Sequence, residues 1–150
     1  WPGLEVQPWL RDELVIVSAP NDPLALQAAD KPLGSAALRQ ARWLLREAGS
    51  GTREMVEHAL LPRLHQLPAA ATLGNSEAIA RCVAQGLGIS CLPRVLVQPL
   101  VDAGDLVLLP TTLPRMQRHF SLLQRAGKRH SPALAAFVQA CQQFAPGDRV

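Results

Sequence analysis

The apolar residues of the chain fall into short runs and helical stripes, separated by turn residues. Short continuous apolar runs predict buried strands, and they occur at 13–19, 42–45, 69–73, 89–93, 106–110 and 119–124. Apolar residues spaced three or four positions apart predict helices, and they occur at 34–41, 53–64, 74–88 and 131–144. Because strands alternate with helices through the middle of the chain, the pattern indicates an α/β fold with mainly parallel strand pairing.

Turn and cap residues set the expected ends of these elements. Ser35 and Ser131 each stand at the start of a helical pattern, where a hydroxyl can cap the first turn. Pro62 is expected to end or kink its helix, and Gly86 is expected to stop the next one. The segment PNDPLA at 20–25 predicts a turn.

One turn, GSGTRE at 49–54, resembles three known motifs and matches none of them. A Walker loop ends in Gly-Lys-Ser/Thr, whereas this segment continues as Gly51-Thr52-Arg53. A dinucleotide fingerprint has a third glycine where Glu54 stands, and GLGISC at 86–91 fails in the same way. A nucleophile elbow reads G-x-S-x-G, whereas Ser50 lies directly between two glycines.

The histidines do not predict a metal centre or a catalytic dyad. None of the four has a metal-ligand spacing, and no H-E-x-x-H motif occurs. Glu54 and His58 are four residues apart, which is typical of an exposed pair on a helix. The sequence therefore nominates no enzyme and implies no cofactor.

Two strand-to-helix turns remain as candidates for a binding site. Each is expected to present free backbone N–H groups with partial positive charge, which take either an anion or a side-chain cap. In an open α/β sheet, ligands bind beyond the carboxyl ends of the strands. Side by side, the turns would form a polar mouth poor in carboxylates, built from Ser50, Thr52, Thr72, Gly74, Asn75 and Ser76. A small anion site and a pair of capped helices both remain open.

Composition and charge fit a soluble globular chain. Apolar residues make up 48% of its 150 residues, and the formal net charge of +3 is spread along the chain without a long basic block. The most basic stretch, RAGKRH at 125–130, is typical of a solvated turn. Cys82, Cys91 and Cys141 form no C-x-x-C pair, so buried reduced thiols in a cytosolic protein are expected. No apolar run is long enough to span a membrane, and the N-terminus lacks the pattern of a signal peptide.

Four segments together resemble the effector-binding domain of LysR-type transcriptional regulators. The similarity extends over about residues 4–144, and the segments occur in the family's order and at its spacing. They are DELVIVSAPNDPLA (12–25), WLLREAGSGTREMVE (43–57), LGNSEAIARCVAQGLGISCLP (73–93) and FSLLQRAGKRHSPALAAFVQAC (120–141).

The resemblance implies a periplasmic-binding-protein-like (type 2) fold with two α/β lobes. Residues 13–103 would form the second lobe, and 1–12 with 104–145 would contribute to the first, leaving 146–150 as a tail. The family's N-terminal DNA-binding domain and the opening part of its first lobe have no counterpart in the chain. Promoter DNA is therefore expected to be bound through a domain outside this chain, and the first lobe is expected to be incomplete here.

The resemblance also implies effector contacts, which map onto Ser18, Thr72, Leu73, Gly74 and Asn75. Ser50 and Thr52, at the start of the neighbouring helix, are further candidates. Members with similar GSGTRE and LGNSEAI segments include regulators that sense sulfur oxyanions, so a small anionic effector is expected. The family further implies a cytoplasmic homodimer or homotetramer that has no membrane partner.

Three alternatives remain open at this point. A solute-binding protein of a transport system has the same two-lobe fold. An enzyme on this scaffold, such as a dehydratase, would need a proton-transfer residue in the cleft, and none stands out. A redox switch would use Cys82 or Cys91.

Overall fold

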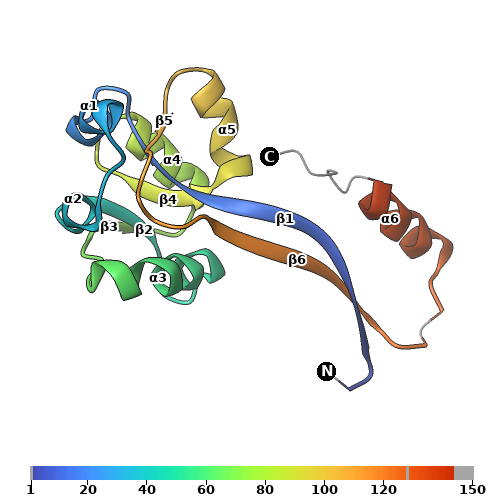
Figure 1. The fold of residues 1–150 in the computed structure, drawn as a ribbon. Helices are drawn as coiled ribbons and strands as arrows, with labels where there is room; N and C mark the ends of the chain where they lie inside the picture. Colours follow the sequence, from blue (N-terminus) through green and yellow to red (C-terminus); the bar gives the residue numbers. More distant parts are fainter. Residues whose placement is uncertain (1, 128, 144–150) are drawn as a thin grey trace. The chain divides into compact units, whose positions relative to one another are not determined.

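A computed structural model describes residues 2–127 and 129–143 of the chain (Figure 1). Its strands are β1 (Leu4–Ser18), β2 (Trp43–Arg46), β3 (Ala69–Leu73), β4 (Ser90–Pro93), β5 (Val107–Leu108) and β6 (Met116–Arg125). Its helices are α1 (Pro23–Asp30), α2 (Ser35–Arg39), α3 (Gly51–Leu64), α4 (Ser76–Ala84), α5 (Arg94–Asp102) and α6 (Pro132–Gln143).

The chain divides into two compact units, and β1 runs through both. The first unit comprises Trp1–Asp12 and Gln117–Val150, and the second comprises Glu13–Met116. The family resemblance implies that residues 104–116 belong to the first lobe. The structure places them in the second, because β5 pairs with β1 there and Leu106 and Leu109 are buried in its core.

Strand pairing in the second unit is mixed, which corrects the expectation of mainly parallel pairing. β1 pairs antiparallel with β4 and with β5. β2 pairs parallel with β3, and a parallel bridge between Trp43 and Ile89 joins β2 to the start of β4. Alternating strands and helices predict parallel pairing for a βαβ step such as β2–α3–β3. The alternation does not predict how β1 pairs, because its partners β4 and β5 come much later in the chain.

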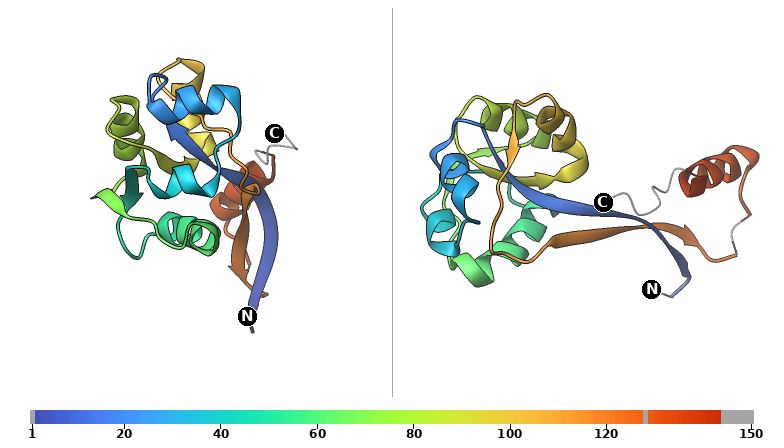
Figure 2. Two further views of the ribbon diagram at one scale, coloured as in Figure 1. Left: turned by 60° about the vertical axis from the view of Figure 1, so that its left-hand side comes forward. Right: turned by 45° about the horizontal axis from the view of Figure 1, so that its top comes forward.

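The two faces of these strands are covered by different helices, as Figures 1 and 2 show. Successive side chains on a strand point to opposite faces. Trp43 and Leu45 accordingly join a cluster with Val56 and Leu60 of α3, whereas Leu44 joins a second cluster with residues of α4 and α5. The predicted apolar spacing of α3 and α4 is therefore confirmed, since both helices bury their stripes against the strands.

Two helices of this unit were missed by the sequence analysis. The segment expected to be a turn contains the start of α1, where Asp22 accepts a hydrogen bond from the N–H of Leu24 at 2.8 Å and Pro23 occupies the first position. Both are helix-start signals. α5 follows β4 directly and carries Pro99 in its interior, which hides the helical pattern.

Helix ends also differ in part from the sequence expectations. Ser35 does not cap α2; it is the first helical residue, and Gly34 is the cap. Ser131 does cap α6, because its Oγ accepts a hydrogen bond from the N–H of Leu134 at 3.3 Å. Pro62 does not end α3, which continues to Leu64.

The last turn of α3 is closed by His65 in a left-handed conformation. Its φ is +61°, and its N–H donates to the carbonyl of Leu61 at 2.8 Å. This conformation crowds a Cβ, so glycine is the residue that usually occupies such a position.

His65→Gly is expected to raise the free energy of unfolding by about 1 kcal/mol, because glycine has no Cβ to strain. Urea denaturation followed by circular dichroism measures the change. Gln66→Gly is the matched control, since only His65 among the described non-glycine residues has a positive φ. That control is expected to lower stability; an equal effect of both substitutions would contradict the assigned strain.

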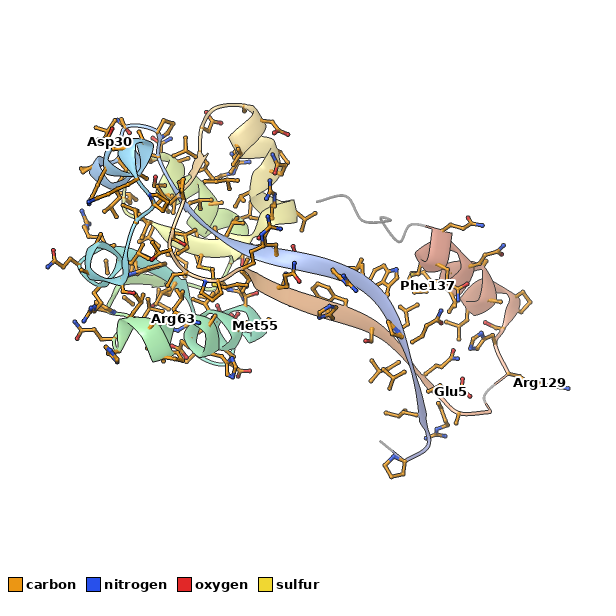
Figure 3. All side chains as sticks on the ribbon, in the orientation of Figure 1. Glu5, Asp30, Met55, Arg63, Arg129 and Phe137 are labelled. Carbon is orange, nitrogen blue, oxygen red and sulfur yellow. The ribbon has the colours of Figure 1, made fainter. Side chains whose placement is uncertain are left out.

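The first unit contains β6 from Gln117 onwards, α6 and the opening part of β1. The indole N–H of Trp9 donates to the carbonyl of Cys141 at 2.7 Å, and Arg118 pairs with Asp12 at 2.6 Å. Of the buried apolar residues in the described part of the chain, all but Cys141 lie in the second unit. Phe137 of α6, labelled in Figure 3, is 61% exposed.

Candidate functional site

The carboxyl ends of β2 and β3 lie side by side, and each is followed by a turn that begins a helix. The register places Arg46, the last residue of β2, beside Leu73, the last residue of β3. α3 begins after the turn at 47–50, and α4 begins after Gly74 and Asn75. Both helix N-termini therefore start from one edge of the strands, as expected from the sequence.

Arg46 joins the two turns. Its guanidinium donates to Ser76 Oγ at 2.9 Å and holds both carboxylate oxygens of Glu47, at 2.7 and 2.8 Å. A guanidinium has five N–H donors, and these contacts use three of them. The side chain of Arg46 is 21% exposed, so its remaining donors stand at a partly desolvated edge.

Arg53 places a second guanidinium at the same edge. It donates to the backbone carbonyl of Arg46 at 2.8 Å and pairs with Glu57 one turn further along α3 at 2.5 Å. The first contact anchors α3 to the end of β2 through the main chain of Arg46 rather than through its side chain. The edge thus combines two arginines with two helix N-termini, all of which favour negative charge.

Side-chain caps take part of the N–H capacity of both helices. Ser50 Oγ accepts from the N–H of Arg53 at 3.4 Å. Asn75 Oδ1 accepts from the N–H groups of Glu77 and Ala78 at 2.7 and 3.1 Å. Both helices are therefore capped, and the contacts left for an anion are the remaining arginine donors, the hydroxyls of Ser76 and the exposed Thr72, and the first-turn N–H groups that the caps do not use.

Glu47 neutralises much of the positive charge of Arg46 at this edge. The hydrogen bonds from Arg46 lower the pKa of Glu47 to about 2, with a further contribution from its own backbone N–H. The same pairing raises the pKa of Arg46. The sequence predicts a mouth poor in carboxylates, and the position of Glu47 beside Arg46 corrects that prediction.

The carboxyl group of Glu47 is expected to stay ionised well below pH 4 while Arg46 is present. Because its folded pKa is depressed, the stabilisation from this pair is present above the unfolded pKa and lost as pH falls towards 2. Carboxyl-carbon NMR should show no titration of Glu47 between about pH 6 and 3.5, and Arg46→Met should raise its midpoint towards the usual value of about 4.3. A midpoint near 4.3 in the unsubstituted protein would contradict the pairing.

Most of the residues predicted to bind an effector lie at this edge. Thr72 and Gly74 are exposed, Leu73 packs partly into the core, and Asn75 is the exposed cap of α4. At the start of α3, Ser50 is buried and Thr52 is half-buried.

Ser18 does not lie with the other predicted residues. It ends β1, which runs antiparallel to β4 with Val17 opposite Ser90. Ser18 is therefore level with the start of β4 and of β2, at the opposite edge of the strands. It is fully buried, and its hydroxyl donates to the carbonyl of Ala19 at 3.1 Å.

The arginines and Glu47 were missed by the sequence analysis. Arg46 ends an apolar run and looks like an ordinary solvated residue at the end of a strand. The available signal was its place immediately before one helix-start turn, in the strand next to a second such turn.

Three further features of the chain bear on metal binding, thiol reactivity and membrane spanning. Among the described residues, no group of three or more His, Cys, Asp or Glu side chains could hold a metal ion. Cys91 is buried, and burial raises the pKa of its thiol to about 12, which makes it a poor nucleophile. None of the helices within 2–127 and 129–143 is long and apolar enough to cross a membrane.

Comparison with known proteins identifies the family. Residues 1–146 match the family model described as the LysR substrate binding domain. An uncharacterised HTH-type transcriptional regulator of Escherichia coli, YeiE, is 44% identical over 135 residues, which cover 90% of this chain and 45% of the relative. The RuBisCO operon transcriptional regulator of Allochromatium vinosum is 29% identical over 134 residues, covering 89% of this chain and 43% of that protein.

The fold matches solved regulatory domains of the same kind. The CcmR regulatory domain of Synechocystis, solved in complex with 2-PG, superposes with a TM-score of 0.78 at 28% identity. The match covers 97% of this chain and 68% of that one. The chain thus spans about half the length of the curated relatives it matches and has a periplasmic-binding-protein-like α/β fold. It belongs to the LysR family of transcriptional regulators, through the substrate-binding domain of that family.

Proposed function

We propose that the chain senses a small anion at the carboxyl edge of β2 and β3. The observation that carries the proposal is Arg46, whose guanidinium extends from the end of β2 to Ser76 at the start of α4. This hydrogen bond between the end of β2 and the start of α4 is not required to cap either helix, and an isolated surface arginine would not form it. It places a cation where two helix N-termini begin, so an anion there would contact charge-assisted donors from both turns.

The size and polarity of the edge favour a compact oxyanion over a ring compound. The contacting groups are guanidinium N–H groups and hydroxyls, and the exposed side chains beside them, such as Thr72, are small. Sulfur oxyanions such as sulfite, sulfate and thiosulfate are our preferred class, following the resemblance of the GSGTRE and LGNSEAI segments. The related CcmR domain was solved with a small ligand, 2-PG, and this supports ligand sensing by the fold.

Binding would act on transcription by shifting a conformational equilibrium. A ligand with different affinities for two arrangements of the domain biases the population towards the one it prefers. In a cytoplasmic homodimer or homotetramer, this bias would change how the DNA-binding domains of the complete regulator meet the promoter. A solute-binding protein of a transport system is the alternative, and the matched relatives favour the regulator because they are transcriptional regulators by name.

A melting experiment tests the proposal. The protein, expressed from the complete coding sequence of its gene, is heated in sulfate, sulfite, thiosulfate, phosphate, nitrate and several carboxylates at constant ionic strength. At about one hundred times its dissociation constant, a ligand adds about 2.7 kcal/mol, which corresponds to a rise of roughly 5–10 °C for a domain of this size. A rise with one class of anion is expected, and no rise with any of them would overturn the proposal.

Two conservative variants localise the binding. Thr72→Val removes a hydroxyl at constant shape, and Asn75→Asp keeps a cap of similar strength while adding a negative charge. Both are expected to melt normally without ligand and to lose most of the ligand-induced rise. An unchanged rise in both variants would place the anion elsewhere.

A further inference from the structure

A second concave site lies on the second unit, at the edge opposite the candidate anion site. It is a pocket of about 640 Å³ between α1, α2 and the turn that leads into β4. Arg42 and Ile89 line it, and they immediately precede β2 and β4. The candidate anion site is at the carboxyl end of β2, so the two sites stand at opposite ends of that strand.

The pocket has an apolar wall made of small and medium side chains. Leu24 and the alanines of α2 form one part of that wall, and Ile89 forms another. Gly86 and Gly88 also line the pocket and contribute backbone only. The volume lies within the range of small-molecule sites, which are mostly apolar with a few polar groups that fix orientation. A compact aliphatic group fits this lining.

Two opposite charges line the pocket without pairing with each other. Within the described residues, the guanidinium of Arg42 has no hydrogen bond or ion pair, and Asp22 forms no salt bridge. One carboxylate oxygen of Asp22 accepts from the N–H of Leu24, which fixes the side chain at the start of α1. The amide side chains of Gln27 and Gln40 also line the pocket and bond to no described group.

We propose that this pocket binds a zwitterionic amino acid with an apolar side chain. Arg42 would hold the α-carboxylate, since a guanidinium matches a carboxylate in geometry and charge. Asp22 would receive the α-ammonium group, and the apolar wall would contact the aliphatic side chain. The inference is independent of the anion site, because it uses other residues at the other end of β2.

A titration with L-leucine and three analogues tests the proposal. The ¹⁵N-labelled protein, expressed from its complete coding sequence, is titrated with L-leucine and followed by amide NMR. Shifts are expected at Leu24, Gln40 and 86–89. 4-Methylpentanoate lacks the ammonium group, isoamylamine lacks the carboxylate and isoamyl alcohol lacks both, so the first two should bind about tenfold more weakly and the alcohol weaker still.

Variants separate recognition from folding. Arg42→Met should reduce L-leucine affinity about tenfold or more, and Asp22→Asn should do the same while retaining an N-cap of equal quality. Arg63→Met is the control, because this substitution also removes one positive charge. Arg63 lies in the last turn of α3, outside the pocket (Figure 3). The proposal is overturned if L-leucine shifts no pocket amide, if 4-methylpentanoate binds as tightly as L-leucine, or if Arg42→Met binds as well as Arg63→Met.

Discussion

Gly88→Ala is expected to destabilise the protein by about 4 kcal/mol or more, in the range reserved for severe core or backbone disruption. A Cβ at this position would lie 2.2 Å from the carbonyl oxygen of Arg42, and Gly88 also has a φ of +151°. That oxygen cannot move away freely, because it accepts a hydrogen bond from the N–H of Ile89 at 2.9 Å. Alanine therefore meets both a backbone clash and a conformation that L-residues avoid.

The clash would fall on the junction between β2 and β4. The N–H of Leu44 donates to the carbonyl of Ile89 at 2.9 Å, and Ser90 Oγ donates to the carbonyl of Leu44 at 2.7 Å. These bonds join the β2–β3 pair to the strands around β1, so displacing residue 88 disturbs both apolar clusters. Loss of cooperative unfolding, or expression as insoluble protein, would agree with this expectation.

Urea denaturation of Gly88→Ala beside Gly51→Ala measures the effect. Gly51 begins α3, its φ is not in the left-handed region, and an added Cβ meets no atom within 4 Å. Alanine there is expected to be neutral or to stabilise by up to about 1 kcal/mol. Equal stability of the two variants would show that the approach of Gly88 to Arg42 is not rigid.

The part of the fold that could be predicted from sequence is the part set by local pattern. β3 has the predicted bounds, β2 lies within one residue of them, and the apolar stripes of α3 and α4 face the core. A short buried strand and an amphipathic helix differ in the period of their apolar residues, and that period is visible in the sequence.

Long-range placement could not be predicted, because it depends on partners that sequence spacing does not reveal. Ser18 ends an apolar run just as Leu73 does, yet β1 is antiparallel to β4 and Ser18 lies at the other edge. Arg46 donates to Ser76, which is thirty residues later in the chain, and the local sequence around neither residue predicts this contact. Gly88 likewise occurs in a GLG segment that failed as a nucleotide motif, and its role appears only beside Arg42.

Arg46→Met is expected to weaken binding of the sensed anion about 100-fold. A hydrogen bond to a charged group contributes about 1.5–3 kcal/mol, and about 2.7 kcal/mol corresponds to a factor of 100. The fold should survive, since Arg53 donates to the backbone carbonyl of Arg46 and that contact does not need the side chain. Calorimetric titration with the anion that raises the melting temperature most measures the loss.

Glu47→Gln is expected to change affinity in the opposite direction. Its carboxylate holds two donors of Arg46 and repels an incoming anion, so its removal should tighten binding severalfold at low ionic strength. Asp30→Asn is the control, because this substitution also removes one negative charge, but at the end of α1 (Figure 3). If Arg46→Met and Glu47→Gln both leave affinity unchanged, the helix N-termini alone hold the anion. Opposite shifts would instead identify Arg46 as the contact and Glu47 as the group that the anion displaces.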